Sequence, residues 1–260
     1  MIPSNFHTHT VFCDGEDTPE ELVLRAIDLG CGEIGFSGHS YTPFDDDYCM
    51  SPESEREYIK TVLSLKEKYR GKIRIFLGIE QDYYSVVPDF DYDYIIGSVH
   101  YVKKNGFYIS VENTPELLEE GVKAHYHGDY YALVEDYYQN VADLYQKTKC
   151  NVVGHFDIVT KFNQNNRLFD IRHPRYIAAY QKALESLFAT DCAFEINTRG
   201  SSPSPDRKNF PDSTIEAILR ENHRKIIWTS DCHKKEFLIA GLPNHDNAGN
   251  IPRLKTNDEV

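Results

Sequence analysis

The chain has 260 residues but no uninterrupted apolar stretch approaching about 20 residues, the length that a membrane-spanning helix needs. Its first residues lack the basic region and the apolar core of a secretory signal. Repeats at a solenoid period, low-complexity tracts and linker-like segments are also missing. We therefore expect a single domain that resides in the cytoplasm and makes no contact with a membrane.

Cysteine pairs with CxxC spacing are missing too. The six cysteines are scattered, at Cys13, Cys31, Cys49, Cys150, Cys192 and Cys232. In a chain without a secretory signal, isolated cysteines of this kind are interpreted as free thiols in a reducing compartment.

Positive charge is scarce. The sequence has 28 lysines and arginines against 41 aspartates and glutamates, which gives a formal net charge of −13. A surface with this charge repels a phosphate backbone, so we do not expect long nucleic acid as a partner. A local basic pocket for one small phosphate remains compatible with this balance.

Short apolar segments alternate with segments of helical periodicity along the chain. Seven of the apolar segments are predicted as strands: 6–9, 34–39, 73–79, 94–99, 152–154, 192–197 and 225–230. Buried parallel strands have continuous apolar runs of this kind, with helices as the connections between them. The pattern therefore predicts an α/β fold with a parallel sheet.

Polar residues mark the carboxyl ends of these predicted strands. Six of the seven carry a histidine, aspartate or glutamate at or just beyond that end, and the remaining one ends in Asn197. In a closed β/α barrel all these ends lie on one face, where the active site is built. Residues far apart in the sequence are then expected to meet in space.

The convergent residues are of two metal-binding types, imidazole and carboxylate. His7 and His9 share one side of a strand, because successive side chains alternate. The whole set is His7, His9, Asp14, His39, Glu80, His100, His155, Asp231 and His233. Any one of these histidines could be a hydrogen-bonded core residue. Together the nine suit zinc, manganese or iron rather than calcium, and their number implies two or three ions.

The motifs that carry these residues also point to a family. They are, in chain order, Phe6-His7-Thr8-His9-Thr10 with Asp14-Gly15, Gly38-His39-Ser40, Gly78-Ile79-Glu80, Ser98-Val99-His100, Gly154-His155-Phe156-Asp157 and Ser230-Asp231-Cys232-His233. In this order they resemble the polymerase and histidinol phosphatase (PHP) superfamily, and most closely its histidinol-phosphate phosphatases. The resemblance covers roughly residues 5–235.

The resemblance implies a distorted (β/α)7 barrel in one domain, with the active site at the carboxyl ends of the strands. It also implies how the ligands divide: His7, His9, Glu80 and Asp231 hold a first ion, Glu80, His100 and His155 a second, and Asp14, His39 and His233 a third. The implied enzyme is a histidinol-phosphatase of histidine biosynthesis, which converts L-histidinol phosphate to L-histidinol and phosphate. A metal-bridging hydroxide would attack phosphorus, and Asp231 or His233 would carry the proton to the leaving oxygen.

Two alternatives remain open. A PHP phosphoesterase that acts on nucleotides or other small phosphorylated metabolites would use the same cluster. A non-catalytic metal-binding module is a different class of protein, and the full ligand set disfavours it. Each of the two enzymes would take a small phosphorylated substrate as its partner.

Phosphate binding is assigned to Lys161 and Arg199, which shortly follow predicted strands. The alternative is that both are solvated loop charges. At position 199 the family more often has a small residue, and Arg207-Lys208 is another basic pair. The acidic run 45–47 could attract a cationic amine, but we interpret it as a surface loop.

The last residues depart from the family pattern. We expect the PHP phosphatase domain to span residues 1–241 and a polar C-terminal tail to span 242–260. The tail is rich in proline, asparagine, aspartate and glycine and has no apolar periodicity. Family members usually continue with a further helix at this point. The tail is therefore interpreted as truncated or diverged, and closure of the barrel at this end is not assured.

Overall fold

The computed structural model describes residues 3–198, 209–243, 247–252 and 254–255. Six strands form one parallel sheet in the order β1-β2-β3-β6-β7-β8, and β4 and β5 form a separate antiparallel pair. The strands are β1 (Glu33–Phe36), β2 (Arg74–Asp82), β3 (Tyr94–Ser98), β4 (Tyr101–Lys104), β5 (Phe107–Ser110), β6 (Val152–Val153), β7 (Ala193–Asn197) and β8 (Ile226–Thr229). The α-helices are α1 (Pro19–Asp28), α2 (Pro52–Lys68), α3 (Pro115–Tyr126), α4 (Tyr130–Thr148), α5 (Pro174–Phe188) and α6 (Ser213–Glu221).

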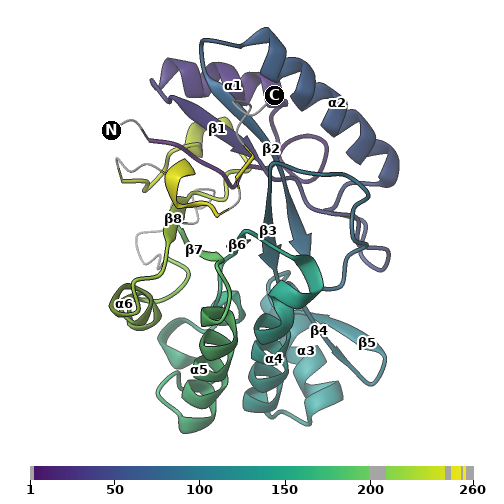
Figure 1. Ribbon diagram of the computed structural model, residues 1–260. Coiled ribbons are helices and arrows are strands. Elements are labelled where there is room, and N and C mark those ends of the chain that lie inside the picture. The colour runs from purple at the N-terminus through teal and green to yellow at the C-terminus, as the bar shows by residue number, and fades with distance from the viewer. Residues whose placement is uncertain (1–2, 199–208, 244–246, 253, 256–260) are drawn as a thin grey trace.

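The helices lie around the curled sheet. α1 and α2 pack beside β1 and β2, whereas α4 and α5 lie side by side next to β3 and β6 (Figure 1). α1 begins at a capping box, in which the Thr18 hydroxyl accepts from the Glu21 N–H and the Glu21 carboxylate accepts from the Thr18 N–H. This sharp start turns the chain out of the N-terminal segment and onto the outside of the sheet.

The predicted first strand is not a regular strand in the structure. Residues 5–9 instead make isolated bridges with β1 on one side and, on the other, with Cys232, three residues after the end of β8. The Gly35 N–H donates to the Asn5 carbonyl over 2.8 Å, and the His9 N–H donates to the Cys232 carbonyl over 2.8 Å. The segment therefore lies between the two outer strands of the sheet. Together with the six strands it forms the predicted distorted (β/α)7 barrel.

A tyrosine fills much of the barrel interior. The Tyr94 hydroxyl donates to the carbonyls of Phe6 and Phe36 at 2.6 and 2.9 Å. A Cβ atom added at Gly78 would lie 2.4 Å from the Tyr94 ring, and one added at Gly35 would lie 2.5 Å from its hydroxyl. Both glycines are needed because the ring occupies the space of a side chain.

A hairpin leaves the barrel at its carboxyl end. β4 and β5 follow β3 directly and are joined by Asn105 and Gly106, whose φ angles are +53° and +87°. Both residues thus adopt the left-handed conformation that a tight hairpin turn requires. The hairpin and α3 lie together at one edge of the molecule (Figure 1). The chain returns to the barrel mouth after Ser110, where the Val111 N–H donates to the His100 carbonyl.

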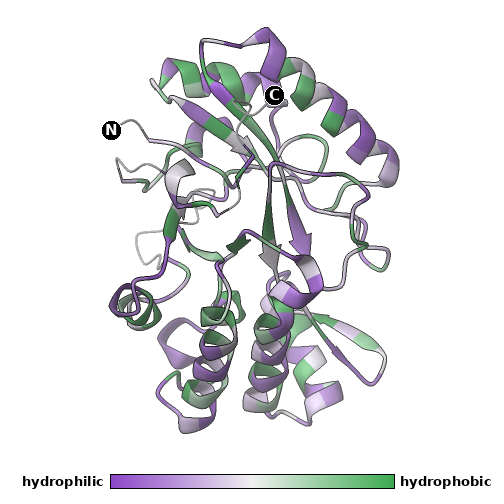
Figure 2. Ribbon diagram, in the orientation of Figure 1, coloured by the Kyte–Doolittle hydropathy of each residue, from purple (hydrophilic) through white to green (hydrophobic). Residues whose placement is uncertain are grey.

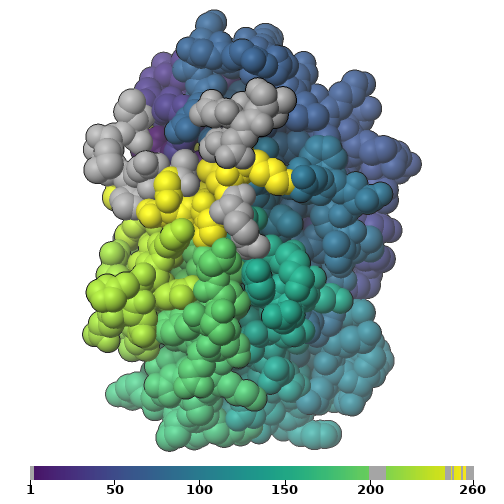
Figure 3. Space-filling view, viewed as in Figure 1, coloured from purple at the N-terminus to yellow at the C-terminus, as the bar shows by residue number. Residues whose placement is uncertain are grey.

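Part of the predicted polar tail packs against the barrel. The Asn247 side chain accepts from the Trp228 N–H over 2.8 Å and donates to the Ser4 carbonyl over 2.7 Å. Ile251 is 5% exposed and belongs to the apolar group inside the barrel. In Figure 3 the yellow C-terminal residues lie between the blue and the green parts of the chain. The division of the chain at residue 241 stays a prediction, whereas the contacts of 247–252 are part of the fold.

The helices carry apolar and polar stripes, which Figure 2 shows most clearly for α4 and α5. Helices that cover a sheet on one side and meet water on the other have this pattern. In the part of the chain that the structure describes, no helix has both the length and the apolar character needed to cross a membrane.

Candidate metal centre

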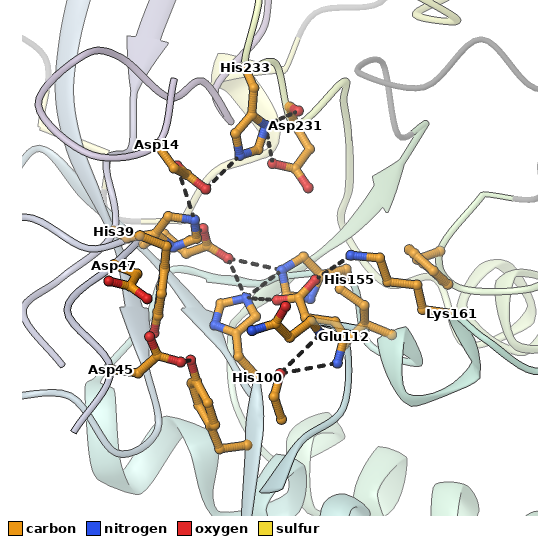
Figure 4. Close-up of a pocket in the computed structure, with 17 residues that line it drawn as sticks. Asp14, His39, Asp45, Asp47, His100, Glu112, His155, Lys161, Asp231 and His233 are labelled. Carbon is orange, nitrogen blue, oxygen red and sulfur yellow. Dashed lines mark hydrogen bonds and ion pairs between the residues drawn. The ribbon is translucent and has the colours of Figure 1, made fainter. Parts of the chain in front are cut away.

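The structure brings all nine predicted ligands together at the carboxyl ends of the strands (Figure 4). One of them, Glu80, lies within β2. Those that follow β1, β3 and β6 are His39, His100 and His155, respectively, and those that follow β8 are Asp231 and His233. The N-terminal segment contributes His7, His9 and Asp14. Each of the nine belongs to at least one of four groups whose ligand atoms lie within 4.8 Å of one another. The residues that were predicted to meet, because each lies at the end of a strand in a barrel, therefore do lie close together in the structure.

Glu80 lies in the middle of the cluster and is 1% exposed. Its Oε2 is 3.0 Å from Nδ1 of His39 and 3.1 Å from Nε2 of His7. Its Oε1 is 2.9 Å from Nε2 of His155 and 3.3 Å from Nε2 of His100. The two carboxylate oxygens thus face two different pairs of histidines, which is the arrangement of a carboxylate that bridges two ions.

Two other carboxylates complete the cluster. Asp231 Oδ1 lies 3.1 Å from Nε2 of His9 and 3.4 Å from Nε2 of His7. Asp14 Oδ2 lies 3.3 Å from Nε2 of His233. His9 therefore stands between them, since its other ring nitrogen is 3.6 Å from Asp14 Oδ1.

Several buried atoms of this cluster make the close contacts given above without the geometry of a hydrogen bond. They include Nε2 of His7, Nε2 of His9 and Oε2 of Glu80. A buried polar atom without a partner costs on the order of 1–3 kcal/mol, so a fold retains such atoms together only where something else satisfies them. Imidazole and carboxylate lone pairs that face one another at these distances fit divalent metal ions.

The charges of the cluster also favour a cation. Burial opposes ionisation of Glu80, but the neighbouring histidines hold the pKa of its carboxyl well below its usual range. Burial disfavours the charged form of His233, yet Asp14 and Asp231 raise its pKa to about 9. The carboxylates thus stay ionised in a buried site and attract positive charge, which divalent ions supply.

Glu195 supports the centre from behind and was not predicted as a site residue. It lies inside β7 and is fully buried. Its Oε1 contacts Nδ1 of His7 at 2.5 Å, and its Oε2 accepts from the His155 N–H at 2.5 Å. A glutamate in the middle of a buried strand is rare unless it is paired, and this was the signal in the sequence.

Asp82 supports His100 in the way that Glu195 supports His7. Its Oδ2 accepts from the His100 backbone N–H at 2.8 Å and lies 3.3 Å from Nδ1 of that ring. Asp82 is two residues after Glu80 in β2, so both side chains leave the strand on the same side. Carboxylates behind ligand histidines fix the orientation of the ring.

The cluster opens into a cavity of about 710 Å³. Its wall includes seven of the predicted ligands, together with Asp45, Asp47, Tyr48, Tyr101, Ser110, Glu112, Asn113, Ile158, Lys161 and Phe210. The volume greatly exceeds that of a phosphate ion, so the cavity has room for an organic group as well.

Comparison with known proteins decides the family. The PHP domain family matches residues 5–199 of this chain. The chain belongs to the PHP domain family. The curated histidinol-phosphatase of Bacillus subtilis is 29% identical to this PHP domain protein, over 88% of this chain and 92% of the relative.

Two solved structures share the fold of this PHP domain. The hisK protein of Listeria monocytogenes superposes with a TM-score of 0.79 at 22% identity, covering 92% of this chain and 98% of the other. The histidinol phosphate phosphatase of Lactococcus lactis, solved with zinc, L-histidinol and phosphate, gives a TM-score of 0.61 at 22% identity, over 90% and 87% of the two chains. The distorted α/β barrel expected from the sequence is thereby confirmed.

Of the two residues predicted to bind phosphate, only one lies in the part of the PHP domain that the structure describes. Lys161 follows β6 and lines the cavity, with its Nζ 3.1 Å from Oε2 of Glu112. Arg199 and the alternative pair Arg207-Lys208 lie outside the described residues. Lys161 is thus placed where it can meet a substrate.

Glu112 was not predicted. It follows the β4-β5 hairpin instead of a strand of the sheet, so no strand end marked it in the sequence. Burial opposes its ionisation, but Lys161 and His100 lower the pKa of the Glu112 carboxyl to about 2.

The interpretation of the acidic run 45–47 as a surface loop is corrected in part. Asp45 and Asp47 line the cavity of this PHP domain, whereas Asp46 is not among the lining residues. Oδ2 of Asp45 accepts from the Tyr101 hydroxyl at 2.6 Å. The loop lies next to the metal cluster because Met50, which ends it, donates its N–H to the His39 carbonyl.

Proposed function

We propose that this PHP domain protein is a metal-dependent histidinol-phosphatase that hydrolyses L-histidinol phosphate to L-histidinol and phosphate. The observation that carries the proposal is the convergence of nine imidazole and carboxylate groups on one cavity. Curated relatives that match most of the chain are named histidinol-phosphatases, and the Lactococcus lactis relative was solved with the two products and zinc. The cytoplasmic location stays a prediction from the sequence.

The proposed centre holds two or three divalent ions, with zinc, manganese and iron as the candidates. His7, His9, Glu80 and Asp231 would hold the first, Glu80, His100 and His155 the second, and Asp14, His39 and His233 the third. When bound, such ions lower the pKa of coordinated water and stabilise negative charge on phosphoryl oxygens. The short distances from Glu80 to His7 on one side and to His100 and His155 on the other support its proposed role between the first two ions.

The remaining roles fall to side chains at the cavity wall. Asp231 and His233 both line the cavity, and either would carry a proton to the oxygen of the leaving alcohol. Nδ1 of His233 lies 3.0 Å from the Asp231 carbonyl, which orients the ring. Lys161 and Arg199 would bind phosphate oxygens, and for Lys161 the support is its place in the cavity wall.

A screen of phosphate release tests this proposal. The purified protein is assayed with added Mn²⁺ or Zn²⁺ on a panel of small phosphomonoesters, and we expect L-histidinol phosphate to be the best substrate. Equal release from all simple monoesters would overturn the substrate assignment but retain the hydrolysis. Release from nucleotides alone would support the alternative PHP phosphoesterase.

Asp231→Asn tests the centre itself. Asp231 has a φ of +51°, a conformation that asparagine tolerates, so this change removes the charge at little conformational cost. We expect phosphate release to be abolished and the metal content to fall. Asp46→Asn, in the same acidic loop as two lining residues but outside the cavity wall, is the matched control and should keep activity.

A further inference from the structure

An ion pair stands in the cavity next to the metal ligands. Oε2 of Glu112 is 3.1 Å from Nζ of Lys161, and Oε1 of Glu112 is 3.2 Å from Nε2 of His100. Figure 4 shows the Lys161 side chain extending toward this carboxylate. Glu112 comes from the segment after the β4-β5 hairpin, which follows β3, and Lys161 comes from the segment after β6. β3 and β6 are neighbours in the sheet, so the pair joins two adjacent loops at the mouth of the barrel.

The cavity has more carboxylates than the metal cluster uses. Asp14, Glu80 and Asp231 belong to the ligand groups, whereas Asp45, Asp47 and Glu112 do not. Among the described residues of the cavity wall, Lys161 is the one lysine or arginine. Outside the ligand groups, the cavity wall therefore carries more carboxylates than lysines or arginines, and a bound phosphate, itself an anion, adds to this negative charge.

A phosphate that enters the cavity competes with Glu112 for Lys161. The side chains of Glu112 and Lys161 are 25% and 30% exposed, so water only partly solvates them. If Lys161 turned to a phosphate oxygen, Glu112 would lose its cation in a poorly solvated place, and an unpaired carboxylate there is costly. A positive charge on the same substrate removes this cost, because it replaces Lys161 as the partner of Glu112.

We propose that the substrate splits the Glu112–Lys161 ion pair, with the phosphate taking Lys161 and a cationic group of the leaving alcohol taking Glu112. Glu112 then selects phosphomonoesters that carry a positive charge over those that do not. The inference rests on the proposed function, since it assigns the specificity of the same hydrolysis. L-histidinol phosphate, with its ammonium group, belongs to the selected class.

The test is Glu112→Gln, which keeps the shape of the side chain and removes its charge. We measure kcat/KM for L-histidinol phosphate and for glycerol 3-phosphate, which has no cation. The ratio of the two values should fall about tenfold or more, because a hydrogen bond to a charged group is lost for one substrate only. Glycerol 3-phosphate should be hydrolysed at least as well as by the unchanged protein.

Glu119→Gln is the matched control. Like Glu112, Glu119 is paired with a basic side chain, in its case Arg167, but it lies in α3 and does not line the cavity. The ratio of its kcat/KM values for L-histidinol phosphate and glycerol 3-phosphate should equal that of the unchanged protein. Bound metal is counted in both variants and should be unchanged, because Glu112 belongs to none of the ligand groups.

A binding measurement separates this proposal from the proposed function. In calorimetric titrations, Glu112→Gln should weaken the binding of L-histidinol in the presence of phosphate without weakening the binding of phosphate. An unchanged ratio, or an equal loss for both substrates, would overturn the role of Glu112 while leaving the hydrolysis established. Failure of the unchanged protein to hydrolyse any phosphomonoester would overturn both proposals.

Discussion

A single buried carboxylate, Glu195, contacts both His7 and His155, which the proposed centre assigns to two different ions. It contacts Nδ1 of His7 and the backbone N–H of His155, each at 2.5 Å. A bond at Nδ1 leaves Nε2 of His7 facing Glu80, 3.1 Å away. Carboxylates behind a ligand histidine orient the ring and raise its basicity, so Glu195 acts on the metal centre without belonging to it.

Replacement of Glu195 by glutamine tests this role. The change keeps the size of the side chain but removes the charge behind His7. We expect metal affinity and phosphate release to fall roughly 10- to 100-fold. Metal bound per chain, measured across a range of free metal concentrations, checks the affinity, and kcat/KM checks the activity.

Glu33→Gln provides the control for this variant. Glu33 is also a buried glutamate at 6% exposed, but it pairs with Arg74 at the start of β1, away from the cluster. It should retain full metal affinity. If Glu195→Gln retained it as well, the proposed support of His7 would be wrong.

At the scale of the elements, the barrel depends on short strands and on glycines that admit a large ring. β6 has only two residues and is followed by His155, and residues 5–9 make only isolated bridges yet contain His7 and His9. Tyr94 stabilises this arrangement from the inside, because its hydroxyl bonds to the carbonyls of Phe6 and Phe36 on neighbouring segments. Close packing around this ring leaves no space at Gly78.

Gly78→Ala should therefore destabilise the protein. The new Cβ would lie 2.4 Å from the Tyr94 ring, and the hydroxyl of that ring is held by a hydrogen bond shared between the carbonyls of Phe6 and Phe36. Forcing one methyl group into a packed core costs about 1–3 kcal/mol of the free energy of unfolding, which urea denaturation measures.

Gly32→Ala is the comparison for this prediction. No atom lies within 4 Å of a Cβ placed at Gly32, so its free energy of unfolding should stay within about 1 kcal/mol of the unchanged protein. Equal stability of the two variants would show that Tyr94 can move aside.

At the scale of the whole molecule, the C-terminal residues contribute to the core. Ile251 joins the apolar group that includes Phe6, Tyr94 and Ile227, from three separate parts of the chain. The Asn151 side chain donates to the Pro252 carbonyl at 2.7 Å, which attaches the same segment beside β6. Residues 247–252 thus contact both β8, through Trp228, and the start of β6, through Asn151.

Ile251→Ala measures this contribution. Truncation of a buried isoleucine leaves a cavity and should lower the free energy of unfolding by about 2–5 kcal/mol. Leu24→Ala, at a position that is 51% exposed, should change it by less than about 0.5 kcal/mol. A small effect at Ile251 would mean that residues 247–252 do not contribute to the stability of the barrel.

The sequence by itself determined the fold class and the nine candidate ligands. This was possible because each apolar strand and the polar residue at its end are neighbours in the chain, and because the parallel barrel brings all such ends to one face. Glu80, His100 and His155 could therefore be assigned to one site without knowledge of any distance.

Only the tertiary structure decided which side chains support that site. Glu195 meets His7 across 188 residues of sequence, and Glu112 meets Lys161 across 49. No local pattern encodes such pairs, because they depend on how separate elements pack against one another. The same reason applies to Ile251, whose burial follows from the return of a polar segment to the barrel.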